Sequence, residues 1–536
     1  MKYFLFSCCL ALLIFQPVEG QRRSNINAPA QAWWEHIKYL ADDKNMGRET
    51  GSEGHRRAAQ YVANVFKRAG LKPGGTSLFY QLIKFRARRI VEQESSLALI
   101  RNGKTIPIVL GDEATFNIRV DNAPQIEAPV VFVGYGLTVP DMNYDDLAGL
   151  DLQNKVVLLL SGAPSNIPGP LRSHYQSERW KFLKRAGAIG VLSIQNPKGM
   201  DIPWERSKLN RFLPSMVLDD PSLDETAGQR LGVSMNPATT EKFFEGSGHS
   251  FKEILELANN EKPLPKFSIS ASVRATVKVT SSSLESQNVV GILPGTDPRL
   301  KNEYVVLSAH LDHLGVSQQP EGDRIYNGAM DNASGIATLL ETARALGRRR
   351  KPLRRSVVFL AVTAEEKGLL GSKYFAHYPT VPPTNIVANV NVDMFLPLFP
   401  LRSLIVQGLE ESDIAVDLRL AGDTLGIKMI SDPEPERNSF TRSDQYNFVK
   451  RGVPAVSLKI GFVKNSPEHE TVKSWRTKRY HDPSDDLQQP MDFEAAVDFN
   501  RIYLRIVESM ANRPKRPQWN NDSFFKRFAF DIKTTP

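Results

Sequence analysis

Histidine and aspartate residues gather after one apolar run of the chain, in "SAHLDHLGV" at residues 308–316. Imidazole nitrogens and carboxylate oxygens are donors that zinc accepts, although a single loop histidine is more often structural than a ligand. The motif therefore predicts a metal site only if other segments supply further ligands. In that case we expect His310 to bind metal, Asp312 to accept its second imidazole proton, and His313 to be an ordinary loop residue.

Four more polar segments follow or connect apolar strands in the second half of the chain: "NGAMDNASG", "FLAVTAEE", "IVANVNVD" and "KRYHDPSDD". Their candidate residues are Asp331, Glu365, Glu366, Asp393, Tyr480 and His481. Taken alone, an Asp or Asn before a helix is typical of an N-cap, and a pair of glutamates that opens a helix is typical of an interaction with the helix dipole. However, ligands in an α/β sheet bind at the carboxyl ends of strands, and carboxylates buried together repel one another unless cations lie between them. The set therefore predicts a site for two zinc ions.

Two imidazoles and three carboxylates supply nitrogen and oxygen ligands for two zinc ions and leave room for a water molecule that bridges them. Asp331 has two oxygens and could contact both ions. Glu365, which is adjacent to the ligand Glu366, would then be free to act as the general base toward that water.

The candidate residues lie where apolar strands alternate with helices, from about residue 286 to 512. Near-continuous apolar strands in this rhythm predict an α/β fold with a mixed, mainly parallel sheet sandwiched by helices. The helices expected within 31–70 have no sheet of their own, so we assign them to the same domain. Between 125 and 275, short β-branched strands and loops rich in Pro, Gly and Asp predict an inserted β-rich unit.

Five motifs occur in the order "AHLDHLG", "GAMDNASGIA", "TAEEKGLLGSKYF", "NVDM" and "YHDPSDD". In this order they resemble the co-catalytic zinc aminopeptidase family, which also includes glutamate carboxypeptidases and glutaminyl-peptide cyclases. The resemblance covers most of 286–510. It implies the zinc exopeptidase fold and a cis peptide bond between Asp331 and Asn332.

The resemblance also implies a role for each candidate residue. It gives one zinc ion to His310, Asp331 and Asp393, and the other to Asp331, Glu366 and His481. Glu365 would be the base, and Tyr480 would hydrogen-bond the tetrahedral oxyanion. One departure is Gln445 in "SDQYNF", where many members have histidine. Glutamine cannot carry charge, which leaves substrate contacts at this position open.

The β-rich insertion resembles a protease-associated domain, a non-catalytic module found inside some members. The domain organisation that we expect is a signal peptide at 1–20, the N-terminal part of the peptidase domain at 21–124, the insertion at 125–275, the zinc peptidase catalytic domain at 276–515 and a loosely attached C-terminal tail at 516–536.

Composition agrees with a soluble globular protein of more than one core, since the 536 residues are 41% hydrophobic and 24% charged. The apolar run from Tyr3 to Phe15 predicts a cleaved secretory signal that is too short to span a bilayer. Both cysteines, Cys8 and Cys9, lie inside that signal, so the mature chain would have no thiolate metal site. The net charge is +9, but the densest basic run, 348–355, has no interleaved aromatics, which argues against nucleic acid as a partner.

These features predict an exported di-zinc aminopeptidase, periplasmic or extracellular, that acts on peptides with a free N-terminus. A carboxypeptidase of the glutamate carboxypeptidase type is an alternative, because Arg437 and Arg442 in the expected rim loop could bind a substrate α-carboxylate. A catalytically inactive, receptor-like binding protein is another, although it would be expected to lose ligands or the base. A glutaminyl cyclase is disfavoured, since cyclases are usually compact and lack the insertion. Side-chain specificity, oligomeric state, the physiological metal and the role of the insertion do not follow from the sequence.

Overall fold

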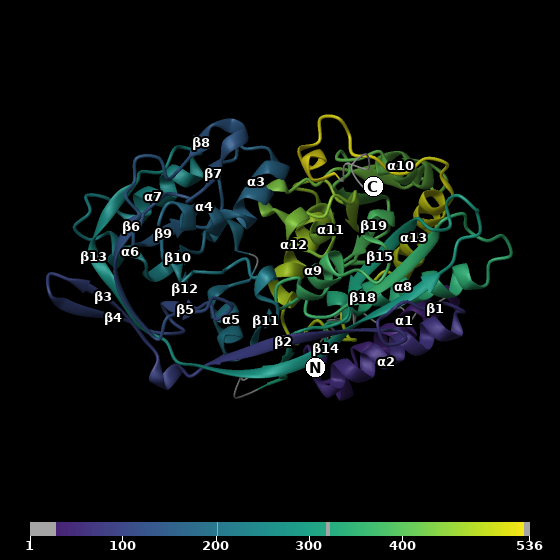
Figure 1. Cartoon of the computed structure of the whole chain (residues 1–536), viewed down its shortest axis with the longest axis horizontal. Helices are drawn as coiled ribbons and strands as arrows, with labels where there is room; N and C mark the ends of the chain where they lie inside the picture. Colours follow the sequence, from purple (N-terminus) through teal and green to yellow (C-terminus); the bar gives the residue numbers. More distant parts are fainter. Residues whose placement is uncertain (1–27, 201, 318–321, 530–536) are drawn as a thin grey trace, which may run out of the picture.

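The computed structural model describes residues 28–200, 202–317 and 322–529 (Figure 1). The predicted signal peptide, with both cysteines, lies outside these residues. Two β-sheets organise the described chain, one of ten strands and one of eight. No helix within the described ranges is both long and apolar enough to cross a membrane.

The larger sheet has the strand order β11-β2-β14-β18-β15-β19-β22-β20-β21, and β1 pairs with β14. These strands are β1 (Lys72–Pro73), β2 (Tyr80–Ile90), β11 (Ser215–Leu218), β14 (Val279–Leu293), β15 (Tyr304–His310), β18 (Ser356–Val362), β19 (Ile386–Val392), β20 (Ser403–Gln407), β21 (Lys428–Ile430) and β22 (Ala455–Ile460). The central strands β18, β15, β19 and β22 are parallel, whereas β14 and β20 run antiparallel beside them. The predicted mixed α/β sheet is confirmed, but it is not mainly parallel, because four of its strand pairs are parallel and five are antiparallel. Its parallel centre directs several strand ends to one edge.

Helices cover both faces of the larger sheet, which explains why every residue of β18 and β19 is buried. Side chains alternate along β15, so Val305 and Leu307 join the core under one set of helices and Val306 joins the core of the opposite face. The first set is α1 (Ala28–Leu40), α2 (Glu53–Arg68), α8 (Ser334–Gly347) and α13 (Phe493–Asn512), and the opposite face packs against α9 (Leu370–His377) and α11 (Gln445–Val449).

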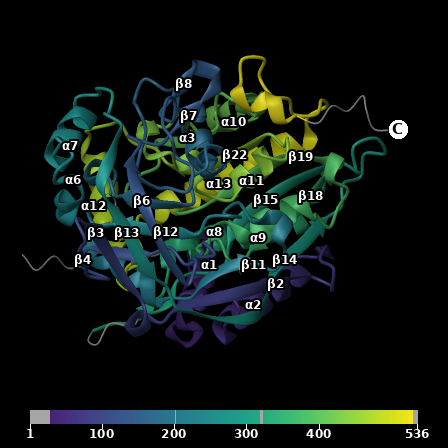
Figure 2. The same cartoon turned by 60° about the vertical axis from the view of Figure 1, so that its left-hand side comes forward.

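The smaller sheet has the order β4-β3-β13-β6-β9-β10-β12-β5. Its strands are β3 (Ser96–Arg101), β4 (Lys104–Ile108), β5 (Ala114–Phe116), β6 (Gln125–Phe132), β9 (Val156–Leu160), β10 (Gly190–Ile194), β12 (Leu231–Met235) and β13 (Phe267–Thr276). The long antiparallel pair β2–β14 belongs to the larger sheet and extends from it toward the smaller one (Figures 1 and 2). Strands β3, β4 and β5 precede residue 125 and yet pair here, while β11 pairs with β2 in the larger sheet, so the domain boundaries at 125 and 275 stay a prediction.

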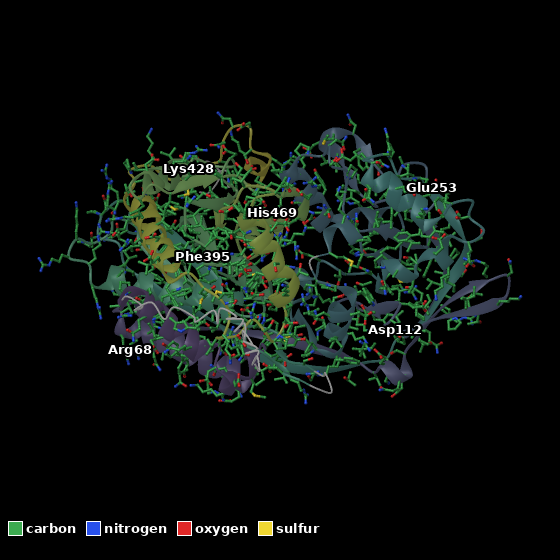
Figure 3. The ribbon with its side chains drawn as sticks, turned by 180° about the vertical axis from the view of Figure 1, so that it is seen from behind. Arg68, Asp112, Glu253, Phe395, Lys428 and His469 are labelled. Atoms are coloured by element: carbon green, nitrogen blue, oxygen red, sulfur yellow. The ribbon has the colours of Figure 1, made fainter. Side chains whose placement is uncertain are left out.

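The remaining strands and helices connect the elements named above. They are β7 (Thr138–Val139), β8 (Tyr144–Asp145), β16 (Gly315–Val316), β17 (Ile325–Tyr326), α3 (Gly169–Ser177), α4 (Arg179–Arg185), α5 (Trp204–Ser207), α6 (Glu241–Phe244), α7 (Phe251–Asn259), α10 (Ile414–Asp423) and α12 (Pro467–Arg479). Among them, α10 and α12 also pack into the core of the larger sheet. Seen from behind, Phe395 and His469 lie on the side of the larger sheet, and Asp112 and Glu253 on the side of the smaller one (Figure 3).

Residues 516–529 are not the loosely attached tail that we expected. Trp519 and Phe525 are buried, and the indole N–H of Trp519 donates to the carbonyl of Gly452 at 3.0 Å. Phe525 packs against Phe440 with a ring-centroid distance of 5.3 Å. Buried aromatic side chains remove a large apolar area from water, and this anchors the segment on the fold.

Candidate metal centre

The five predicted metal ligands meet at the carboxyl edge of the larger sheet. His310 is the last residue of β15, Asp393 directly follows β19, and Glu366 lies in the turn after β18. Asp331 lies in the irregular turn before α8, and His481 lies just after α12. The rule that sites form where parallel strands end accounts for His310, Glu366 and Asp393, and the loops of Asp331 and His481 meet them at this edge.

Two groups of donor atoms share Asp331. His310 Nε2 lies 3.1 Å from Asp331 Oδ1 and 3.5 Å from Asp393 Oδ1. His481 Nε2 lies 3.4 Å from Asp331 Oδ2 and 3.1 Å from Glu366 Oε2. Each oxygen of Asp331 thus faces a different histidine, which is the arrangement required of a carboxylate that contacts two ions.

The spacing of these atoms suits zinc. A tetrahedral ion with zinc–ligand bonds of 2.0–2.1 Å holds neighbouring ligand atoms about 3.4 Å apart. The four nitrogen–oxygen distances of the two groups lie between 3.1 and 3.5 Å. Glu365 also belongs here, since its carboxylate and the donor atoms of His310 and Asp393 lie within 4.8 Å of one another.

Buried negative charge is a second argument for cations. The carboxylates in and around the centre are those of Asp312, Asp331, Glu365, Glu366, Asp393, Asp444 and Asp485. Burial lowers the pKa of His481, but Glu366 and Asp331 outweigh burial and raise the pKa to about 10. A metal ion would replace the proton that these carboxylates otherwise attract to the imidazole, since a ligating histidine must be neutral.

Asp312 supports the centre differently from the prediction. His310 Nδ1 meets the backbone carbonyl of Asp312 at 3.1 Å, and not its carboxylate. The carboxylate instead accepts hydrogen bonds from the backbone N–H groups of Glu365 at 3.1 Å and Glu366 at 3.3 Å, and from the hydroxyl of Thr50 at 3.2 Å. Because the backbone carbonyl of Asp312 contacts the imidazole of His310, its carboxylate is available to fix the turn that carries Glu365 and Glu366.

The prediction that His313 is an ordinary loop residue is wrong. Its side chain is fully buried, and its Nδ1 lies 2.7 Å from Glu366 Oε1, so that Glu366 contacts His313 with one oxygen and His481 with the other. Backbone contacts hold His313 in this position. It forms an isolated parallel β-bridge with Glu49, and its N–H donates to the carbonyl of Arg48 at 3.2 Å. These contacts come from residues far earlier in the chain, so the local sequence around His313 does not reveal them.

Arg48 is a buried residue that the sequence analysis did not single out. Its guanidinium donates to the backbone carbonyls of Leu40 at 2.7 Å, Leu311 at 2.9 Å, Asn327 at 2.6 Å and Gly328 at 2.9 Å. These bonds tie the end of β15 to the turn that leads into Asp331. No motif marks such a residue, since its partners are backbone atoms.

Asp485 was also missed, although it lies within the quoted "YHDPSDD" motif. Its two carboxylate oxygens accept the backbone N–H groups of Met330 and Asp331, each at 2.9 Å. Gln489 donates to the same carboxylate at 2.6 Å. Asp485 therefore holds the main chain of the shared ligand in place.

Asn332 connects the loop of Asp331 to the strand end that bears Asp393. The peptide bond between Asp331 and Asn332 is cis, as the resemblance implied. The side-chain amide of Asn332 donates to the carbonyl of Val392 at 2.8 Å and accepts from the N–H of Met394 at 3.2 Å. Asn332 thus links the main chains of Asp331 and Asp393, the two carboxylates that His310 contacts.

Gln445 makes its contacts inside the protein. Its amide oxygen accepts a hydrogen bond from Asn391 at 3.0 Å, and its amide nitrogen donates to the carbonyl of Phe440 at 2.7 Å. The residue is fully buried. Both polar atoms of the side chain therefore make hydrogen bonds within the protein. Because Gln445 is buried, this departure from the family pattern does not present a polar group to a substrate.

A pocket opens beside Asp393. Its apolar wall consists of Met394, Leu396, Ile405, Ile460, Phe462 and Val472. Its polar lining includes Tyr480 and the charged side chains of Asp432, Glu434, Arg437, Arg442, Lys459 and Arg476. The ring of Tyr480 lies 4.0 Å from that of His481, and burial raises the pKa of Tyr480 well above its ordinary value, so the phenol keeps its proton as a hydrogen-bond donor.

Comparisons with known proteins agree with this geometry. The family described as Peptidase family M28 matches residues 288–507. "Aminopeptidase YwaD" of Bacillus subtilis (strain 168) is 28% identical over 249 residues, which cover 46% of this chain and 49% of that protein. A "Glutamate carboxypeptidase 2 homolog" of Caenorhabditis elegans is 21% identical and covers 80% and 59%, respectively. A "Probable zinc metalloprotease" of Pyrenophora teres f. teres (strain 0-1) is 36% identical and covers 43% and 49%. The chain thus spans about half to three-fifths of the length of these relatives.

The fold recurs in a solved structure, "Aminopeptidase from Aneurinibacillus sp. strain AM-1", with a TM-score of 0.53 and 20% identity over 91% of this chain and 95% of that one. The predicted family resemblance and fold class are confirmed. The family match and the named relatives support the predicted class of zinc metallopeptidase.

Proposed function

From the match of residues 288–507 to Peptidase family M28, we propose that this protein is a di-zinc aminopeptidase that hydrolyses the N-terminal peptide bond of peptides. The observation that carries the proposal is the position of Asp331, whose two oxygens face His310 and His481 separately. One carboxylate shared between two histidine-containing groups suits a pair of neighbouring ions better than a single ion.

In this proposal His310, Asp331 and Asp393 hold one zinc ion, and Asp331, Glu366 and His481 hold the other. Bound zinc would polarise the scissile carbonyl and lower the pKa of water at the site. Asp312, Asp485 and Arg48 bind no metal, and instead fix the backbone of the turns from which the ligands project.

Glu365 is the general base. Burial raises its pKa well above the ordinary value, and Asp393 and Glu366 add to the effect against the opposing charge of His310. A carboxylate with a raised pKa accepts a proton from the attacking water and then donates it to the leaving amine. Asp312 fixes this residue through its backbone N–H, which keeps the carboxylate directed at the same place in both steps.

The pocket beside Asp393 would receive the side chain of the N-terminal residue. Its lining combines aliphatic and aromatic side chains with charged ones, among them Asp432, Glu434, Lys459 and Arg476, so it offers both apolar and charged contacts to that side chain. Tyr480 lies between this pocket and His481, where its phenol can donate a hydrogen bond to the carbonyl oxygen as negative charge develops. The carboxylate of Asp393, which also lines this pocket, offers a partner to the substrate's free α-ammonium group.

A carboxypeptidase is the second candidate function. The relative named "Glutamate carboxypeptidase 2 homolog" and the presence of Arg437 and Arg442 in the pocket wall favour it. Acetylation of the substrate's N-terminus separates the two, because it removes the ammonium group that an aminopeptidase needs and leaves the C-terminal carboxylate intact.

The test is hydrolysis of a panel of aminoacyl-anilides by the purified full chain, with chelation, zinc re-addition and the Glu365→Gln variant. We expect chelation to abolish turnover and zinc to restore it. Glu365→Gln should bind two zinc ions per chain by elemental analysis and lose turnover by about 100-fold or more, since general base catalysis contributes 10²–10⁴-fold. Turnover by Glu365→Gln at the wild-type rate would refute the assignment of the base, and binding of one zinc ion per chain would refute the di-zinc site.

We also propose that the chain is exported and that its β-rich unit is a protease-associated domain. The apolar run from Tyr3 to Phe15 supports export. The short β-branched strands within 125–275 support the domain assignment.

A further inference from the structure

Arg119 reaches the metal centre from the smaller sheet. It follows β5 closely, and its Nη2 donates to the backbone carbonyl of Glu366 at 3.4 Å. A Cβ atom added to Gly368 would lie 2.8 Å from Arg119 Nη1. The guanidinium therefore lies against the turn that carries the proposed base, Glu365, and the ligand Glu366, at a place where a side chain on residue 368 would obstruct it. The end of β5 and this turn come from different sheets (Figure 1).

The backbone around Arg119 is fixed on both sides. Arg88 donates to the carbonyl of Arg119 at 3.0 Å and pairs with Asp121 at 3.4 Å. The N–H of Arg119 donates to the side chain of Asn117 at 3.1 Å. Ile118, the preceding residue, is buried in the core of the smaller sheet. These contacts fix the backbone from which the side chain of Arg119 projects toward the turn of Glu366.

Most of the donor capacity of Arg119 is free for a ligand. A guanidinium has five N–H donors, and within the described residues it makes the single long bond to Glu366. Arg119 is solvent-exposed, yet desolvation lowers its pKa while Glu365 and Glu366 oppose the shift. Arg119 therefore remains exposed while its guanidinium lies against the turn of Glu365 and Glu366, where a substrate can contact it.

The position of Glu365 tells which part of a substrate comes close to Arg119. The base passes its proton to the leaving amine, so the residue that leaves must lie next to Glu365. In a dipeptide the carboxylate carbon is about 2.5 Å from that nitrogen. Arg119 interacts electrostatically with Glu365 and is not among the described residues that line the pocket beside Asp393. It thus faces the leaving residue, and not the N-terminal side chain.

We propose that Arg119 is a specificity-determining residue that binds the free carboxylate of the leaving residue, so that the preferred substrates are dipeptides. This inference rests on the proposed function. A carboxylate accepts two parallel hydrogen bonds from a guanidinium, which fixes its orientation as well as its charge. Longer peptides place an amide where the dipeptide has its carboxylate, and they lose this interaction.

The experiment compares leucyl-leucine with leucyl-leucinamide and trileucine, on the zinc-loaded full chain. A hydrogen bond to a charged group corresponds to about a 10- to 100-fold difference, and we expect kcat/KM for the dipeptide to exceed that for its amide by this factor. In Arg119→Gln the ratio of acid to amide should fall to about 1, and Arg119→Lys should keep part of it. Arg230→Gln is the matched control, because Arg230 is an exposed arginine beside β12 of the same sheet, and it should keep the wild-type ratio.

Calorimetry on the Glu365→Gln protein gives a second readout, since the same ratio should appear in the dissociation constants of the acid and the amide and vanish in the double variant with Arg119→Gln. An acid-to-amide ratio near 1 in the wild-type protein, or one that survives Arg119→Gln, would overturn the inference. Leucyl p-nitroanilide has no carboxylate, so its hydrolysis by the wild-type protein reports on the proposed function alone. Cleavage of acetyl-leucyl-leucine would indicate carboxypeptidase activity. It would still agree with Arg119 binding the carboxylate of the leaving residue.

Discussion

The neighbouring residues Asp485 and Asp486 offer a matched test of how the metal centre is held. Asp485 is buried and accepts the backbone N–H groups of Met330 and Asp331, both at 2.9 Å. Asp486 is more exposed and accepts the backbone N–H of Gln488 at 2.7 Å. The same substitution, aspartate to asparagine, therefore removes a buried contact to the shared ligand in one case and a local turn contact in the other.

Replacing Asp485 with asparagine leaves one oxygen and turns an NH₂ group toward a backbone N–H. One charge-assisted hydrogen bond is lost, which costs about 1.5–3 kcal/mol. Because Asp331 serves both histidine groups, we expect this cost to appear as a 10- to 100-fold loss of zinc affinity, in line with other residues that orient metal ligands, at roughly 1.4 kcal/mol per factor of ten.

The assay is a zinc competition titration against a chromophoric chelator, with the thermal midpoint of the zinc-free protein as a check on folding. Asp486→Asn should bind zinc within about twofold of the wild-type protein, since surface changes usually stay within ±0.5 kcal/mol. If Asp485→Asn retains wild-type zinc affinity while its zinc-free form folds normally, the bonds to the Asp331 loop do not position the metal ligand and the reasoning fails.

Further predictions concern other parts of the molecule. Arg206 of α5 pairs with Asp482 at 3.3 Å beside His481, so Arg206→Gln should weaken zinc binding in the same titration, and Arg206→Lys should weaken it less. Burial lowers the pKa of His174 to about 4, so below pH 6.5 the unfolded chain binds a proton that the folded chain does not, and stability falls by up to about 1.4 kcal/mol per pH unit. His174→Gln should make the thermal midpoint less sensitive between pH 7 and 5; an unchanged slope would contradict this. Chelation should lower the thermal midpoint, because zinc at 1,000 times its Kd contributes about 4 kcal/mol, and re-addition should reverse the change. Mass spectrometry of the exported protein should find its first residue to be Gln21, and a chain that retains Met1 would refute the cleavage site.

The proposed ligands could be located from the sequence because one rule covers most of them. Strands β15, β18 and β19 are parallel and adjacent, so polar residues at their carboxyl ends meet whatever the details of packing. His310, Glu366 and Asp393 follow from this rule alone. His481 does not end a strand, and its assignment needed the family motif.

The supporting residues could not be found in the same way, because their partners are backbone atoms. Arg48 binds four carbonyl groups, and no residue type in the sequence marks a carbonyl as a partner. Asp485 and Asp486 are chemically identical neighbours, and only burial tells which one meets Asp331. His313 resembled a loop residue because the contact that turns it inward comes from residue 48.

Residues outside the larger sheet would affect which substrates the proposed active site accepts. Arg119 comes from the loop after β5, and Arg206 comes from α5, yet both contact turns that carry proposed catalytic or metal-binding residues of the larger sheet. If these contacts act as proposed, the larger sheet supplies the chemistry and the smaller sheet limits the length of the peptide. Substitutions confined to residues 111–122 should then alter the preference between dipeptides and longer peptides and leave the number of bound zinc ions unchanged. An unaltered preference would place peptide-length selection within the larger sheet itself.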